Sequence, residues 1–200
     1  MTDVLSITHD HAVVGVDMPL ALPESGLRPS DRALKSFLGR NGRSLFWTPT
    51  RAAIDAASHA EAVIVNKANG GKGPSAQGWG LAAKIREART ACMSADGDHG
   101  PRVLEVHPES SFTMMNLGQP LPSKKTAAGV GQRIALLESR FGSLTPSLAS
   151  VGDGPIIDDV LDAIAAAWTA RRVLDGEAEW FGGAESDVPD DEGFVLPVPV

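Results

Sequence analysis

Two kinds of hydrophobic pattern occur along the chain, and they predict short buried strands and amphipathic helices. Residues 12–16 and 102–106 are runs of β-branched and apolar residues that stop near proline, which is typical of buried strands ending in loops. Residues 157–174 place apolar side chains at helical spacing, with carboxylates in the first turn. Capping residues and apolar spacing predict further helices that begin at Ser30, Thr50 (running to about Asn66), Ser75, Pro108 and Ser123.

A few strands separated by several helices indicate an α/β or α+β fold. Two strands are fewer than the roughly 4–6 of a typical sheet, so either further strands lie in weakly patterned segments or part of the sheet is absent from this chain. The length of 200 residues predicts a single domain at residues 1–183, with a helical insertion at about 28–100. Residues 184–200 are predicted to form an acidic, proline-rich C-terminal tail.

Composition predicts a protein with a conventional core and no membrane association. Hydrophobic residues make up 42% of the chain, which is enough to fill a core. No apolar run approaches the roughly 18 residues of a membrane span, and no signal peptide precedes the first strand. Cys92 is the only cysteine, which excludes a disulfide within one chain. We therefore expect a cytoplasmic protein.

The charge of the chain is unevenly distributed. The net charge of −7 argues against a protein that binds nucleic acid through bulk charge alone. Residues 24–133 nevertheless carry 15 basic residues against 9 acidic ones, whereas residues 134–200 carry 3 against 13. Two interpretations stay open for the basic region: it could face the phosphates of a ligand, or it could be a solvated helix face.

Three separated segments place acidic residues where catalytic carboxylates could stand. Asp17 follows the first strand, Glu105 lies in the second, and Asp159 and Asp162 share one face of the helix at 157–174. Carboxylate oxygens are preferred ligands of hard divalent cations, so convergence of these acids predicts a metal site. The alternatives are structural, because Asp17 could cap a turn and acids at a helix start suit the helix dipole.

A histidine and several basic residues add to the candidate site. By strand alternation His107 shares the face of Glu105, where it could donate a proton or contact a phosphate, unless that face is simply exposed. A lysine at a helix start opposes the helix dipole unless it faces an anion. The candidate substrate-binding residues are Arg28, Arg32, Arg51, Lys124 and Lys125.

Seven segments resemble a known protein family and occur in the order seen there: VGVDMPLALP, RPSDRALKSFLGR, LFWTPTR, SAQGWGLAAKI, VLEVHPESSF, SKKTAAGVGQR and DDVLDAIAAA. The family is domain-of-unknown-function family 429, predicted ribonuclease-H-like nucleases, and the resemblance covers roughly Val13 to Gly183. It implies a mixed sheet flanked by helices. Members usually begin with a further strand that bears a GVDG-like Asp. The twelve residues before Val13 do not match it, so the resemblance implies that this strand is missing.

The resemblance also assigns roles to the acids of this chain. Asp17 falls on the acid after the middle strand, Glu105 on that of the late strand, and Asp159 and Asp162 on the helix pair. With these roles, the resemblance implies a nuclease-like protein that hydrolyses phosphodiester bonds by a two-metal mechanism. Asp17, Asp159 and Asp162 would bind Mg²⁺ or Mn²⁺.

Two further interpretations stay open beside this one. The chain could be a shortened, non-catalytic homologue that serves as a binding or regulatory domain, or an enzyme acting on small nucleotides. The expected partners are a nucleic acid or nucleotide substrate, and a second copy or another chain that completes the sheet.

Overall fold

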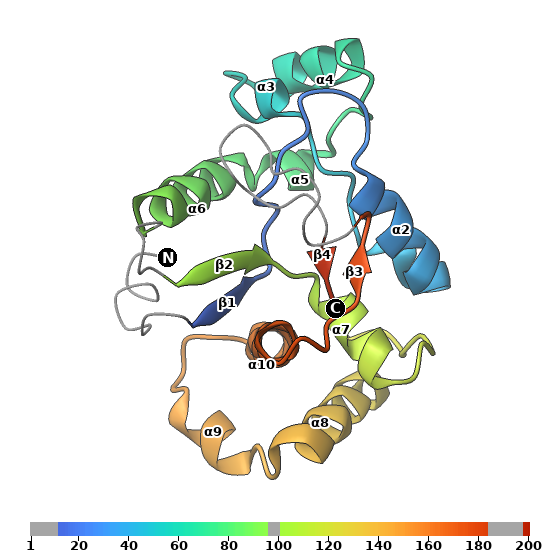
Figure 1. The fold of residues 1–200 in the computed structure, drawn as a ribbon, viewed down its shortest axis with the longest axis vertical. Helices are drawn as coiled ribbons and strands as arrows, with labels where there is room; N and C mark the ends of the chain where they lie inside the picture. Colours follow the sequence, from blue (N-terminus) through green and yellow to red (C-terminus); the bar gives the residue numbers. More distant parts are fainter. Residues whose placement is uncertain (1–11, 96–100, 184–197) are drawn as a thin grey trace.

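The computed structural model describes residues 12–95, 101–183 and 198–200 as a mixed α/β fold (Figure 1). The expectation of a missing N-terminal strand concerns residues 1–11, which lie outside the described residues. The elements in chain order are β1 Val13–Val16, α2 Pro29–Leu38, the 3₁₀ helix η1 Gly39–Arg43, α3 Arg51–Ile54, α4 His59–Ala68, α5 Ala76–Trp79, α6 Ala82–Ala95, β2 Arg102–Glu105, α7 Pro108–Met115, α8 Ala127–Phe141, α9 Thr145–Ser150, α10 Ile157–Leu174, β3 Trp180–Phe181 and β4 Val198–Pro199.

Both strands predicted from β-branched runs are present and pair with each other. β1 and β2 are parallel, with Val13 opposite Arg102 and Val16 opposite Glu105. Parallel pairing places the carboxyl ends of both strands at one edge, where ligands bind in α/β sheets. A second sheet consists of the antiparallel strands β3 and β4, which have two residues each. Strands this short carry no usable periodicity, so the sequence did not predict them.

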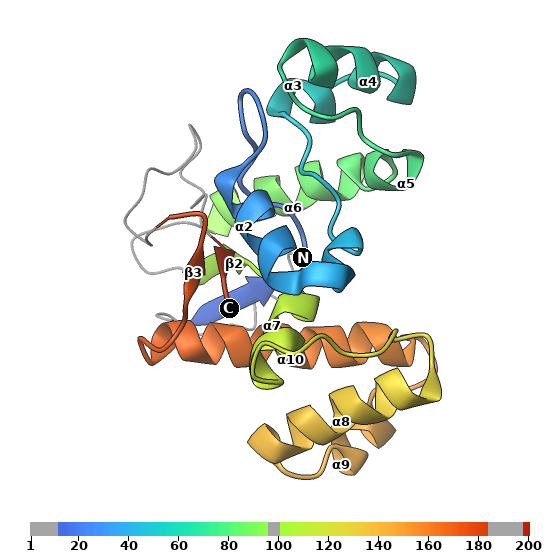
Figure 2. The same ribbon diagram turned by 90° about the vertical axis from the view of Figure 1, so that its right-hand side faces the viewer.

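Helices cover both faces of the parallel pair. Helix α10 packs against β1 on one face, and α8 and α9 lie beyond α10 (Figures 1 and 2). Helix α6 covers the opposite face, where Ala88 and Cys92 pack near Val103 of β2. The close approach of β1 to α10 depends on Gly15, because a Cβ atom there would lie 2.7 Å from the carbonyl oxygen of Ala166. This contact fixes how β1 lies against the middle of α10.

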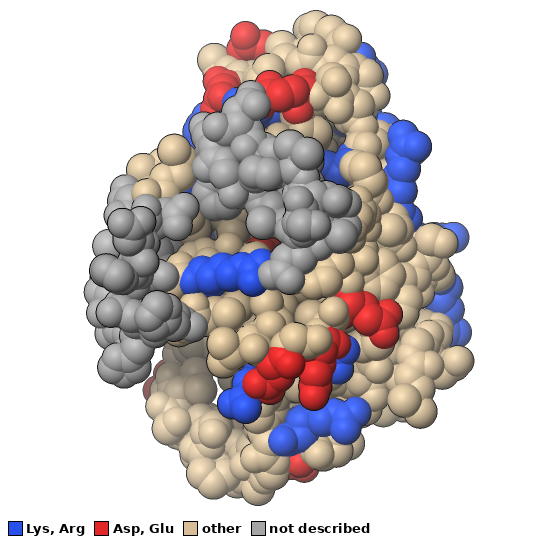
Figure 3. All heavy atoms as spheres, in the orientation of Figure 1, with Lys and Arg blue, Asp and Glu red and all other residues tan. Residues whose placement is uncertain are grey.

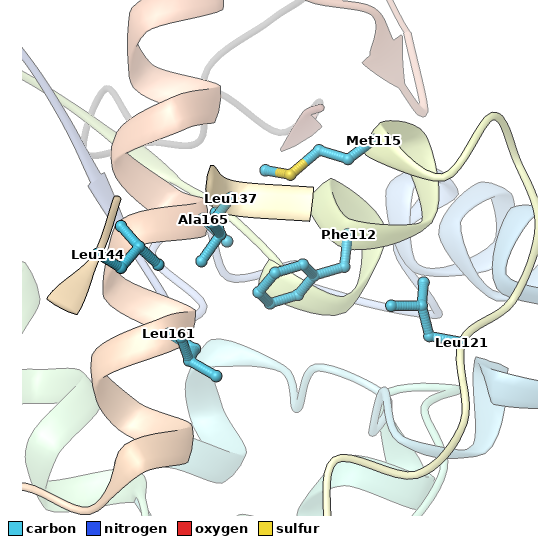
Figure 4. Packing of buried hydrophobic residues seen from close by; sticks show 7 residues of the cluster. All are labelled: Phe112, Met115, Leu121, Leu137, Leu144, Leu161 and Ala165. Carbon is cyan, nitrogen blue, oxygen red and sulfur yellow. The ribbon is translucent and has the colours of Figure 1, made fainter. Parts of the chain in front are cut away.

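The largest apolar cluster joins α7, α8 and α10 into one body (Figure 4). Phe112 of α7 and Leu137 of α8 are fully buried, and Leu161 of α10 is 1% exposed. Burial of each such side chain contributes about 1.5–3 kcal/mol. Because Leu161 adjoins Asp162 in the chain, the cluster also fixes the position of that carboxylate.

Several predicted helices begin or end elsewhere than expected. The helix predicted from Thr50 is interrupted after α3 and resumes as α4, whose cap Ser58 accepts a hydrogen bond from the Glu61 amide. The helix predicted from Ser75 is only α5, and α6 follows after a break at Gly80.

The expected start at Ser123 is also displaced, because α8 begins at Ala127 with Thr126 as its cap. The part of 28–100 that the structure describes contains helices only. The predicted tail differs at its end, since residues 198–200 are buried against Leu34 and Leu38, whereas 184–197 lie outside the described residues.

Candidate active-site pocket

A pocket of about 570 Å³ lies at the carboxyl ends of the two parallel strands. Its walls come from segments far apart in the sequence: the ends of β1 and β2, η1, the start of α7, the turn before α8 and the first half of α10. The charged and titratable residues that line it are Asp17, Arg28, Asp31, Arg40, Arg43, Glu105, His107, Glu109, Lys124, Lys125, Arg133 and Asp162. Met18, Leu45, Phe46 and Leu81 form an apolar part of the wall.

The carboxylate of Asp17 faces this pocket directly after β1. The residue is exposed to solvent where it lines the pocket, and the charged groups of Asp162 and Lys124 lie near its carboxylate. Desolvation by the surrounding pocket wall, followed by the nearby charge of Asp162, raises the pKa of Asp17 to about 6, although Lys124 acts in the opposite direction. Asp17 accepts no hydrogen bond from any residue that the structure describes, so its carboxylate is available to a ligand.

Asp162 lies one turn before Ala166 on α10, and the packing of Gly15 on Ala166 brings it to the same pocket as Asp17. Its Oδ2 atom accepts a hydrogen bond of 2.6 Å from the Lys124 ammonium. Burial lowers the pKa of Lys124, but the hydrogen bond and charge of Asp162 raise it by more, so Lys124 stays protonated. Asp159 shares the helix face but is exposed and does not line the pocket.

Glu105 lies on the pocket wall within a buried ionic network. All five N–H groups of Arg28 are used: two on Asp31, two on the carboxylate of Glu105 and one on the carbonyl of Ala21. The Leu20 amide also donates to Glu105 at 2.9 Å. Arg28 is therefore the counter-ion of two acids inside the protein, whereas the sequence had suggested that it contacts the substrate.

His107 lies at the end of β2, as its N-cap position on α7 requires, and it lines the pocket. Burial lowers the pKa of His107 to about 4; the charge of Asp31 acts in the opposite direction, and the charges of Lys124 and Lys35 lower the pKa further. Its imidazole is therefore neutral at physiological pH and carries one N–H donor. Within the described part of the chain its buried Nδ1 atom has no hydrogen-bond partner.

The predicted substrate-binding cations are divided between the pocket and the outer surface. Lys124 and Lys125 line the pocket, whereas Arg32 and Arg51 do not, and Arg51 pairs with Glu24. Basic side chains also follow the right-hand edge of the face in Figure 3, where α2 lies.

The structure adds two basic residues to the pocket that we did not select, Arg40 and Arg43 of η1. Both belong to the basic region of the sequence, but the path of η1 determines which of its basic residues line the pocket. Arg43 and Lys125 have no acidic partner among the described residues, and Arg40 makes only a 3.5 Å contact with the Pro120 carbonyl. These three cations form the basic rim of the pocket.

The predicted cluster of four metal-binding acids is present only in part. Within residues 12–95, 101–183 and 198–200, no group of three or more His, Cys, Asp or Glu side chains is arranged to hold a metal ion. Among the described acids that line the pocket, Asp17 and Asp162 are the two that no arginine binds, because Arg28 pairs with Asp31 and Glu105 and Arg133 pairs with Glu109. Asp159 lies outside the pocket. This donor set fits one hydrated Mg²⁺ or Mn²⁺ completed by substrate oxygens, which is how Mg²⁺ is often bound, and it does not fit a pair of ions.

The family profile described as Protein of unknown function (DUF429) matches residues 1–187. The chain belongs to this family. Comparison with curated proteins and with solved structures gave no significant match. Among the helices that the structure describes, none combines the length and the apolar character needed to cross a membrane. Family membership thus agrees with the resemblance of the quoted segments and leaves activity to be argued from the pocket.

Proposed function

We propose that this DUF429 protein is a ribonuclease-H-like hydrolase of phosphodiester bonds, with its active site in the pocket of Asp17 and Asp162. The observation that carries the proposal is that one pocket contains both the basic rim and the Asp17 carboxylate, which accepts no hydrogen bond from any described residue. The arrangement of β1, β2 and α10 supports the fold assignment, because acids lie at the carboxyl ends of two adjacent parallel strands and a third lies on the helix that packs against β1.

The side chains of the pocket suit attack on a phosphodiester. The rim cations would neutralise the phosphate, and arginine can bind two of its oxygens at once. Asp17 would accept a proton from the attacking water, since a carboxylate with a pKa near neutrality is effective in that role at pH 7. Neutral His107 would donate a hydrogen bond to a phosphate or leaving-group oxygen.

A divalent ion would give Asp17 a different role from that of proton acceptor, because a bound cation lowers the pKa of its carboxylate ligands. In that arrangement Asp17 and Asp162 would hold one Mg²⁺ or Mn²⁺, which when bound would supply Lewis-acid stabilisation of the phosphate charge. The basic rim would orient the phosphate against these carboxylates. Glu105 would act by fixing the strand end through Arg28 rather than as a ligand.

Hydrolysis of bis(p-nitrophenyl) phosphate, single- and double-stranded oligonucleotides and small nucleotides, with Mn²⁺ or EDTA, tests the proposal. Loss of a proton acceptor costs about 10²–10⁴-fold, so Asp17→Asn should lose at least 100-fold in rate. Arg43→Gln should raise KM, and Arg32→Gln, which removes an exposed cation outside the pocket, should behave as the wild type. A wild type without activity on any of these substrates would refute catalysis.

A non-catalytic binding domain is the second candidate, and the Lys124–Asp162 pair favours it because that pair neutralises one of the two available carboxylates. In that case a fluorescent oligonucleotide should bind without being cleaved, and Arg43→Gln or Lys125→Gln should weaken it. We also propose that a second copy or another chain extends the sheet, since β1 pairs only with β2 among the described strands. Sedimentation velocity tests that assembly.

A further inference from the structure

The turn at residues 122–126 is held rigidly against α8. A Cβ atom at Gly129 would lie 2.0 Å from the Ser123 carbonyl oxygen, so the chain can pass this close only over a glycine. Arg133, which is 2% exposed, donates to the carbonyl of Pro122 at 2.9 Å and pairs with Glu109 at 2.6 Å. A buried arginine therefore fixes the path of a turn that lies at the pocket.

This turn presents Lys124 to the carboxylates of the pocket. The ammonium reaches Asp162 at 2.6 Å, and its charge also acts on Asp17 and Asp158. Asp162 is 13% exposed, whereas the Lys124 side chain is 40% exposed. Since much of the lysine stays in contact with water, its ammonium can leave Asp162 for solvent or for an anion without the turn unfolding.

We propose that Lys124 is a built-in counter-cation that competes with a divalent metal ion for Asp162. The inference rests on the proposed function, because it concerns the ion that Asp17 and Asp162 would hold. An ammonium within hydrogen-bond distance of a carboxylate both occupies one ligand oxygen and repels a doubly charged ion nearby. Metal should therefore bind weakly until a substrate phosphate gives Lys124 another anion to contact.

Mn²⁺ alone is the probe, titrated by calorimetry and by the EPR signal of the free ion at fixed ionic strength. Lys124→Met removes the ammonium and keeps the apolar stem, so Mn²⁺ should bind at least about tenfold more tightly than to the wild type. Lys125→Met is the matched control, because it removes the same charge from the neighbouring position of the same turn without touching Asp162. Its affinity for Mn²⁺ should stay within about twofold of the wild type.

Two further variants make the result decisive. Lys124→Gln repeats the test with a polar side chain should Lys124→Met fail to give a native circular dichroism spectrum. Lys124→Met combined with Asp162→Asn should lose the gain. The inference is overturned if neither Lys124 variant binds Mn²⁺ more tightly, if Lys125→Met gains as much, or if the gain survives without Asp162.

Hydrolysis by the same proteins separates this inference from the proposed function. Tighter Mn²⁺ binding by Lys124→Met without hydrolysis by any variant would support the inference and refute catalysis. Hydrolysis by the wild type together with unchanged Mn²⁺ affinity in the Lys124 variants would do the reverse.

Discussion

Replacement of Arg28 by methionine should strongly destabilise the protein, because this residue holds two buried acids at the pocket. The guanidinium is 3% exposed, Asp31 is fully buried and Glu105 is 11% exposed. Removing one partner of a buried ion pair costs about 3–5 kcal/mol, since the remaining charge is left uncompensated. For a chain of this size about 2–4 °C of Tm is lost per kcal/mol, so we expect a decrease of about 6–20 °C.

The network also predicts that loss of Glu105 lowers the free energy of unfolding less than loss of Arg28 does. Glu105→Gln leaves Arg28 paired with Asp31 and keeps one acceptor oxygen, so it loses one of the two charged hydrogen bonds from Arg28, or about 1.5–3 kcal/mol. Arg171→Met is the control, because its pair with Asp175 is at the surface, where such pairs contribute little to stability.

Urea unfolding followed by circular dichroism gives the three free energies of unfolding. The reasoning would be refuted if Arg28→Met were within about 1 kcal/mol of the Arg171→Met control, or if Glu105→Gln cost more than Arg28→Met.

Three further predictions concern the end of β1 and the start of α10. The pKa of Asp17 is raised from 3.8 to about 6, so the fold favours the protonated acid, and the stability this provides is complete below pH 3.8 and lost as pH rises through 6. Asp17→Asn should therefore have a higher Tm than the wild type above pH 6 and an equal one below pH 4; a pH-independent difference contradicts this. Gly15→Ala should cost about 1–3 kcal/mol in urea unfolding, because its Cβ would meet the Ala166 carbonyl; an unchanged midpoint would show that β1 can shift. Mn²⁺ at 100 times its Kd should add about 2.7 kcal/mol to the stability of the wild type, a gain that thermal unfolding should not detect in Asp162→Asn.

The elements nearest the pocket were predictable because their signals are local. The β-branched residues of β1 and β2 and the apolar stripe of α10 bury one consistent face, and the structure has all three where the sequence places them. The start of α7 at Pro108 was likewise predictable, because proline is favoured at the first position of a helix. The breaks after Ile54 and at Gly80 were not, because packing against other segments interrupts helices whose own residues would allow them to continue.

The sequence was enough to select the acids of the site as candidates, but it did not show which ion pairs they form or which of them line the pocket. The positions of Asp17 and Glu105 at strand ends follow from sequence, because parallel strands end at one edge. No local sequence pattern shows that Glu105 accepts hydrogen bonds from Arg28. Nor does one show that Lys124, 38 residues away in sequence, donates to Asp162. The spacing of Asp159 and Asp162 predicted a shared helix face but not that only Asp162 turns into the pocket.

The alternation of strand and helix and the carboxylates at the carboxyl ends of β1 and β2 follow from backbone preferences and side-chain periodicity, which act over a few residues. The family is likewise recognisable from the order of its sequence segments. Which charged groups meet depends instead on how distant segments pack. The contact of Gly15 with Ala166 sets Asp17 beside α10, and the passage of the chain over Gly129 directs Lys124 to Asp162. Charge interactions fall off with distance and depend on burial, so both follow from the folded arrangement rather than from order along the chain.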